Sequence, residues 1–85
     1  MLLHLGENMV VRLHDVVGIF DMENTTLSAH TRRFLADAEK GGRVTAGSPE
    51  LPKSFVVCHE ADGTETVYLS QLSCATLRGR IRKGG

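Results

Sequence analysis

Aromatic side chains and cysteines are scarce in this sequence of 85 residues, which has no Trp, one Tyr, three Phe and two Cys. A core must therefore be built mainly from Val, Leu and Ile, and a chain of this length accommodates a single domain over residues 1–85. A domain of this size commonly gains only about 3–5 kcal/mol from its own burial. Burial against identical subunits is expected to add stability, so the composition favours a homo-oligomer.

The sequence also lacks the signals of secretion and of membrane insertion. Residues 1–6 contain no basic segment and only a brief apolar run, which predicts neither a signal peptide nor a membrane span. Cys58 and Cys74 have no characteristic spacing and are expected to be free thiols in a reducing compartment. We therefore expect a cytoplasmic protein that does not associate with membranes.

Acidic residues are missing from residues 71–85, which hold four of the ten basic residues of the chain. The other six basic residues and all ten acidic residues lie in residues 1–70, so the body has a formal charge of −4 and the C-terminal segment +4. We call residues 78–85 the basic tail, and its cations are Arg78, Arg80, Arg82 and Lys83. Such a segment suits a nucleic acid, an anionic partner or the acidic surface of a neighbouring subunit.

Motifs for catalysis or metal binding are also missing. The adjacent residues Cys58 and His59 would point to opposite faces of a strand, and no spacing among the remaining histidines completes a zinc site: His4, His14 and His30. No serine lies in a nucleophile-elbow pattern, and no glycine-rich loop opens a helix. We therefore expect no enzyme activity, no metal, no cofactor and no small-molecule substrate.

Short β-favouring runs and turn residues dominate the N-terminal region. Leu2–Leu5 and Met9–Leu13 flank Gly6-Glu7-Asn8, in which Gly and Asn tolerate positive φ, so a tight hairpin is predicted. Val16–Met22 is mostly apolar and is predicted to be a third, central strand, with Gly18 marking a bulge or a close backbone approach. A three-stranded antiparallel start is therefore expected.

A helical period follows. Ser28 is a suitable N-cap, Gly41-Gly42 is a suitable C-terminal stop, and one face of the helix between them carries Thr31, Phe34, Leu35 and Ala38. Arg32 and Arg33 lie on the exposed face. They either contact phosphate groups or form an ordinary solvated surface neutralised by neighbouring acids.

The second half begins with a segment that has no regular period. Residues 45–53 contain both prolines and are predicted to be a loop, and Lys53 at its end is a candidate phosphate contact if an oligomer repeats it around a ring or groove. Two strands are predicted next, Ser54–His59 and Glu65–Leu69, joined by the turn Asp62-Gly63. A helix within Ser70–Arg82, capped by Ser70 or Ser73, ends the chain, and its cations suit either DNA or the helix dipole.

The resulting order of elements is β-β-β-α-β-β-α. Because strands and helices do not alternate regularly, we expect an α+β fold, a mostly antiparallel sheet with two helices packed on it.

Several segments resemble the extracellular matrix regulator family of bacteria: Leu5–Val11, Val16–Phe20, Thr31–Leu35, Pro52–Val57 and Val67–Ser70. The resemblance spans residues 1 to about 80 and is strongest to the RemB branch, the short relative of the RemA regulators. It implies a cytosolic protein of Gram-positive bacteria linked to activation of biofilm-matrix genes. RemA-type members form rings that bind DNA.

One segment departs from the RemA pattern. RemA-type proteins carry an Arg pair in the loop before the strand that begins here at Ser54, whereas this chain has Leu51-Pro52-Lys53. Lys53 alone can be carried over as a phosphate contact.

Two functions stay open. The first is a ring-forming DNA-binding regulator that uses Lys53, with Arg32, Arg33 and the basic tail as further candidates. The second is an oligomeric interaction or scaffold protein that does not bind DNA, in which acidic body and basic tail attract one another between subunits.

Overall fold

The structure, a computed structural model, describes residues 1–22 and 27–83. The last two residues of the basic tail lie outside the described residues. The elements are β1 (Leu2–Gly6), β2 (Met9–Arg12), the short 3-10 helix η1 (Leu13–Asp15), β3 (Val16–Asp21), α1 (Ala29–Lys40), β4 (Val44–Ala46), β5 (Ser54–His59), β6 (Glu65–Ser70) and α2 (Cys74–Lys83).

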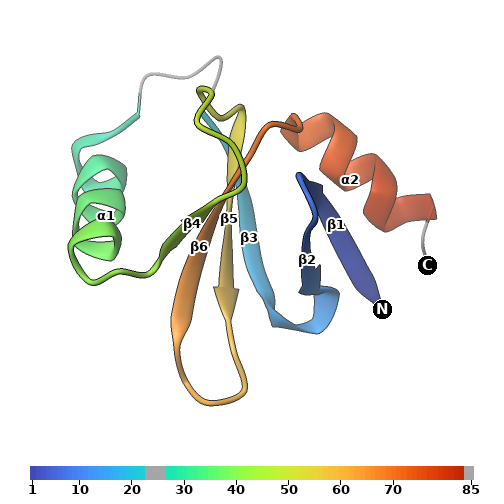
Figure 1. Ribbon diagram of the computed structural model, residues 1–85, viewed down its shortest axis with the longest axis horizontal. Coiled ribbons are helices and arrows are strands. Elements are labelled where there is room, and N and C mark those ends of the chain that lie inside the picture. The colour runs from blue at the N-terminus through green and yellow to red at the C-terminus, as the bar shows by residue number, and fades with distance from the viewer. Residues whose placement is uncertain (23–26, 84–85) are drawn as a thin grey trace.

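The main sheet has four strands in the order β3-β5-β6-β4, and β1 and β2 form a separate two-stranded sheet. The β1-β2 hairpin and α2 lie on one side of the main sheet, and α1 lies on the other (Figure 1). The predicted elements occur in the predicted order, and the predicted α+β class is confirmed.

A short strand, β4, overlaps the start of the segment that was predicted to be a loop, because Thr45 and Ala46 belong to the strand. It pairs in parallel with β6, and the pairing is extended by the Val67 amide, which donates to the Arg43 carbonyl oxygen at 2.8 Å. Three residues are too few for a strand period to be visible in a sequence. The sheet is therefore mostly antiparallel, with one parallel pair at its edge.

The predicted central position of the third strand is wrong, because β3 lies at the edge of the main sheet and pairs with β5. The predicted three-stranded start does not form either, since η1 redirects the chain after β2 and leaves β1 and β2 paired with each other. The apolar composition of β3 does not reflect burial on both faces. Ile19 packs on the core, whereas Val17 and Phe20 are exposed on the opposite face.

The hairpin turn and the helix caps lie at the residues that the sequence predicted. Glu7 and Asn8 both have positive φ, 49° and 65°, as a tight hairpin turn requires. Ser28 and Ser73 cap the two helices, because each hydroxyl accepts a hydrogen bond from the backbone N–H three residues later, at 3.1 Å. Gly42, with a φ of 70°, follows α1 as predicted.

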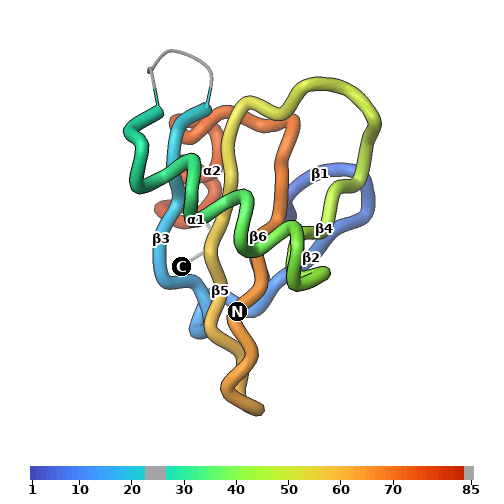
Figure 2. The backbone as a smooth tube through the Cα atoms, turned by 90° about the vertical axis from the view of Figure 1, so that its left-hand side faces the viewer, coloured from blue at the N-terminus to red at the C-terminus, as the bar shows by residue number. Residues whose placement is uncertain are grey.

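Each face of the main sheet has its own core. The core under the hairpin and α2 contains Leu3, Leu5, Val11, Val56, Cys58 and Leu77. The core under α1 contains Ala38, Phe55, Val57 and Val67. Seen from the α1 side, that helix crosses in front of the sheet (Figure 2), and it packs on β4 and β6. The β3 edge on this face is therefore left largely uncovered.

Two buried serines tie the two sheets together. Ser54 and Ser70 are paired across β5 and β6, and both are fully buried. The Ser70 hydroxyl donates to the Leu5 carbonyl oxygen at 2.7 Å and accepts from the Leu72 amide at 3.0 Å. The Ser54 hydroxyl donates to the Leu72 carbonyl oxygen at 2.8 Å. These bonds fix the end of β1 and the start of the turn into α2 to the main sheet.

Candidate nucleic-acid interface

The loop that carries Lys53 is held in place by its backbone. The Lys53 amide donates to the Ser70 carbonyl oxygen at 2.8 Å, and its own carbonyl oxygen accepts from the Met22 amide at 3.0 Å. The Gln71 side-chain amide donates to the Glu50 carbonyl oxygen at 3.0 Å. The Lys53 side chain is nevertheless exposed. A cation on a fixed backbone can contact a phosphate with little loss of backbone entropy.

The two arginines of α1 lie in the first half of that helix. Arg32 and Arg33 are both exposed, and neither forms a salt bridge within the described part of the chain. The salt bridge there is Arg43 to Glu65, at 3.4 Å. Arg43 is thus engaged within the fold, whereas Arg32 and Arg33 are available to an external anion.

The cations of α2 are also exposed, but they lie on more than one face of the helix. Arg78 and Arg82 are four residues apart and share a face. Arg80 donates from Nη1 to the His4 carbonyl oxygen at 3.2 Å, so its side chain turns toward β1. Lys83, in the last turn, lies three residues beyond Arg80. Residues 78–83, the described part of the basic tail, are therefore helical, and the fold fixes their position.

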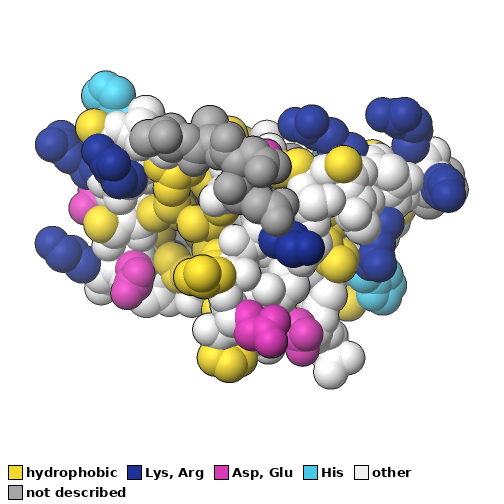
Figure 3. All heavy atoms as spheres, turned by 90° about the horizontal axis from the view of Figure 1, so that it is seen from above, with side chains coloured by type: hydrophobic (Ala, Val, Ile, Leu, Met, Phe, Trp, Pro, Cys, Tyr) yellow, Lys and Arg dark blue, Asp and Glu magenta, His cyan; other side chains and the backbone are white. Residues whose placement is uncertain are grey.

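The structure distributes the predicted contact residues over three places. Arg32 and Arg33 lie on α1, Lys53 lies in the loop before β5, and the remaining cations lie on α2 at the opposite end of the molecule (Figure 1). Viewed from above, Lys and Arg side chains are spread along the length of this face rather than gathered in one patch (Figure 3). One chain therefore presents separated cations, and repetition of the chain would be needed to make them continuous.

Histidines and cysteines offer little chemistry. All four histidines are exposed, and no cluster of three or more His, Cys, Asp or Glu side chains suited to a metal occurs among residues 1–22 and 27–83. Cys58 and Cys74 are free and buried. Burial, followed by the charges of Asp15 and Glu60, raises the pKa of the Cys58 thiol to about 11, and burial also raises the pKa of Cys74. Both thiols are therefore neutral near pH 7 and are poor nucleophiles.

Sequence reasoning missed the exposed apolar side chains. Val17 and Phe20 on β3 are 65% and 45% exposed, and Met1 and Leu2 beside α2 are 56% and 60% exposed. The predicted bulge at Gly18 was the available signal, because a bulge changes which face the neighbouring side chains occupy. These surfaces are interaction candidates of another kind than the cations.

Comparison with known proteins is decisive for the family. The family described as "Extracellular matrix regulatory protein A-like" matches residues 2–81. A relative, the extracellular matrix regulatory protein B of Bacillus subtilis (strain 168), is 35% identical over 82 residues, which cover 96% of this chain and 91% of that protein. This chain belongs to the RemA-like family. The resemblance predicted from the sequence is thereby confirmed.

The RemA-like match includes Lys53, both arginines of α1 and the first half of the basic tail, with Arg78 and Arg80. The chain is accordingly an extracellular matrix regulator by family. Neither helix in the described part of the chain combines the length and the apolar character needed to cross a membrane.

Proposed function

We propose that this chain is a non-enzymatic, cytoplasmic regulator of biofilm-matrix genes in bacteria, and that it acts as a ring-like homo-oligomer binding DNA through phosphate contacts. The observation that carries the proposal is the exposed Lys53 side chain on a loop whose backbone is hydrogen bonded on both sides. Family membership supports the regulatory role.

Phosphate contact is the mode of binding that the side chains favour. The chain has one Tyr, three Phe and no Trp, which are too few aromatic side chains for an aromatic-rich platform on which successive bases could stack. The two helices lie on opposite sides of the main sheet, so they do not form a helix-turn-helix unit for reading a major groove. Cations repeated around an oligomer would instead bind DNA largely independently of its sequence.

The salt dependence of DNA binding tests this proposal. Affinity should fall steeply as salt rises, with a log–log slope of about −0.9 per neutralised phosphate. Lys53→Glu should weaken binding to all sequences similarly and reduce the slope by about 1 per engaged subunit, without changing the mass of the oligomer. Lys40→Glu is the matched control, because Lys40 is exposed at the far end of α1 and makes the same change of charge.

A second candidate function is favoured by the uneven charge and by the absence of the Arg pair at Leu51-Pro52-Lys53. In it, the basic tail joins the acidic bodies of neighbouring subunits, and the oligomer serves as a protein-interaction scaffold. Truncation of the tail would also remove Ile81 from the core, so the double variant Arg78→Ser, Arg82→Ser is the cleaner probe. Two results together would favour the scaffold function over the DNA-binding function. The oligomer of this double variant would dissociate, and the wild type would not retain DNA even at low salt.

A further inference from the structure

Two apolar surfaces lie on opposite sides of the main sheet. The first, the α1–β3 groove, has a volume of about 270 Å³ and is lined by Val17, Phe20, Phe34, Phe55, Val57 and Glu65, among others. The second, the β1–α2 cleft, is larger, about 570 Å³, and its lining includes Leu2, Leu3, Leu13, Gly79 and Ile81. Exposed apolar patches of this kind mark interaction sites in small soluble domains.

The α1–β3 groove exists because of the bulge in β3. Val16 is paired with Cys58 and Gly18 with Val57, so Val17 is an extra residue without a partner on β5. This extra residue places Val17 and Phe20 on the same face, beside α1. Seen from above, apolar side chains fill a hollow between the α1 end and the middle of the molecule (Figure 3).

Phe20 is held in a defined position at this edge. Its ring stacks on Phe55 with the ring centroids 4.9 Å apart. A Cβ atom at Gly18 would lie 2.7 Å from the Phe20 ring, so the absence of a side chain at Gly18 lets the ring adopt this position. Phe20 is nevertheless 45% exposed and Val17 is 65% exposed, and we call these two side chains at the edge of the sheet the Val17–Phe20 projection.

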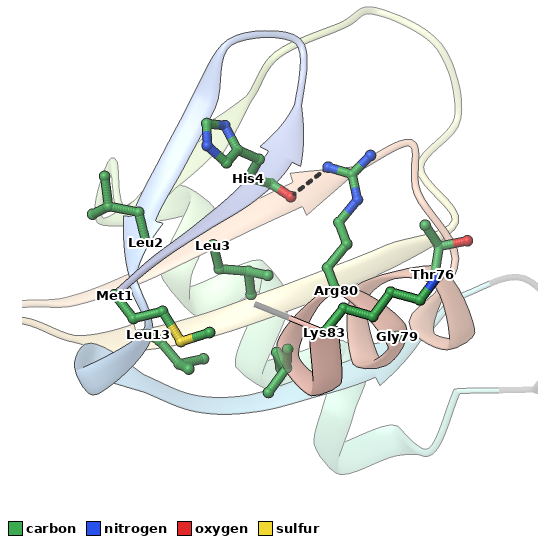
Figure 4. A pocket seen from close by; sticks show the side chains of 10 residues that line it. Met1, Leu2, Leu3, His4, Leu13, Thr76, Gly79, Arg80 and Lys83 are labelled. Atoms are coloured by element: carbon green, nitrogen blue, oxygen red, sulfur yellow. Dashed lines mark hydrogen bonds between the residues drawn. The ribbon is translucent and has the colours of Figure 1, made fainter. Parts of the chain in front are cut away.

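The β1–α2 cleft has an apolar floor and a basic rim. Leu3 comes from β1, Leu13 from η1 and Ile81 from α2. The Arg80 guanidinium reaches the His4 carbonyl oxygen beside the cleft (Figure 4). Gly79 lines the cleft, and a Cβ atom there would meet nothing within 4 Å. The helix therefore leaves space at Gly79 that a side chain of another molecule can fill.

We propose that the occupant of the β1–α2 cleft is the Val17–Phe20 projection of a second copy of this chain. The two surfaces lie on opposite sides of the sheet, so neither can cover the other within one chain. The charged side chains that line the two surfaces are opposite in sign, because Arg80 and Lys83 line the cleft, whereas Glu65 lines the groove. The Glu65 carboxylate stays partly exposed beside Arg43, 3.4 Å away.

Such a contact joins two different surfaces, and every copy uses both of them. Contacts of this type produce closed rings when the rotation between copies closes, and filaments when it does not. The inference rests on the homo-oligomer of the proposed function and adds the residues that build its interface. It also divides the cations of α2: Arg80 and Lys83 lie at the contact, and Arg78 and Arg82 stay free for DNA.

Two variants block the two surfaces separately. Val17→Glu places a charge on the projection, and Gly79→Gln fills the cleft while removing a helix-weakening glycine. Each variant should have the mass of one chain, 9.3 kDa, in light scattering at a concentration where the wild type is larger. Leu51→Glu is the control: Leu51 is 90% exposed on the loop before β5 and lines neither surface, so its oligomer should be unchanged.

Mixing the two blocked variants gives the decisive result. The Val17→Glu copy retains an intact cleft and the Gly79→Gln copy retains an intact projection, so one contact can form per pair. An equimolar mixture should contain a species of twice the 9.3 kDa chain mass and nothing larger. A mixture that stays monomeric overturns the pairing of unlike surfaces.

Other outcomes separate this inference from the proposed function. If both variants keep the wild-type mass, the interface is wrong and the homo-oligomer stands. If the wild type itself is monomeric, the homo-oligomer and this inference both fail. Circular dichroism checks that each variant is folded, and Leu2→Glu, at a side chain that is 60% exposed, replaces Gly79→Gln if that variant does not fold.

Discussion

Ser70→Ala tests how the β1-β2 hairpin is attached to the main sheet. The substitution removes a fully buried hydroxyl that serves both the Leu5 carbonyl oxygen and the Leu72 amide. Each buried polar group left without a partner costs about 1–3 kcal/mol. We therefore expect a loss of about 3 kcal/mol in the free energy of unfolding, which corresponds to a fall of roughly 12–24 °C in Tm for a domain of this size.

Two further serine variants calibrate this value. Ser54→Ala leaves one carbonyl oxygen without its hydroxyl donor and should cost about half as much. Ser48→Ala loses a bond on the exposed loop and should change stability by less than about 0.5 kcal/mol. Urea denaturation at one fixed protein concentration is the assay, because association contributes to apparent stability. A Ser70→Ala variant as stable as Ser48→Ala would refute the anchoring role of the hydroxyl.

Two other predictions concern the core under α2. Leu77→Ala, at a fully buried side chain, should lower the free energy of unfolding by about 2–5 kcal/mol, and a loss under 1 kcal/mol in urea would contradict this packing. Burial, Asp15 and Glu60 raise the pKa of Cys58 from 9.0 to about 11, so the folded state keeps a proton that the unfolded state releases above pH 9. The contribution of the protonated Cys58 thiol to the free energy of unfolding should therefore be fully present below pH 9. Between pH 9 and pH 11 the free energy of unfolding should fall by up to about 1.4 kcal/mol per pH unit. The fall should be steeper in the wild type than in Cys58→Ala.

Local signals explain the parts of the fold that could be predicted. The hairpin at Glu7-Asn8 and the caps at Ser28 and Ser73 depend on residues close in sequence, whose backbone preferences and hydrogen bonds are visible without a structure. The family could also be predicted, because the resemblance depends on runs of residues distributed over the chain.

Long-range pairing explains what could not be predicted. An apolar strand such as β3 is typical of a central position in a sheet. Here the strand lies at an edge, and apolar side chains occupy its uncovered face as well as its buried face. The three residues of β4 become a strand only through their pairing with β6. The cations of the candidate site were identifiable as residue types, whereas their separation onto α1, the Lys53 loop and α2 depends on the tertiary arrangement.

The bulge in β3 has a consequence for insertions and deletions in this strand. Removal of one residue from a strand ordinarily transfers every following side chain to the other face. Deletion of Val17 would instead place Val16 and Gly18 next to each other opposite Cys58 and Val57, which are already consecutive. The alternation of faces would become regular, with Ile19 and Phe20 keeping their partners. The main sheet therefore does not need Val17 for its register, and a variant one residue shorter would separate the requirements of folding from those of assembly.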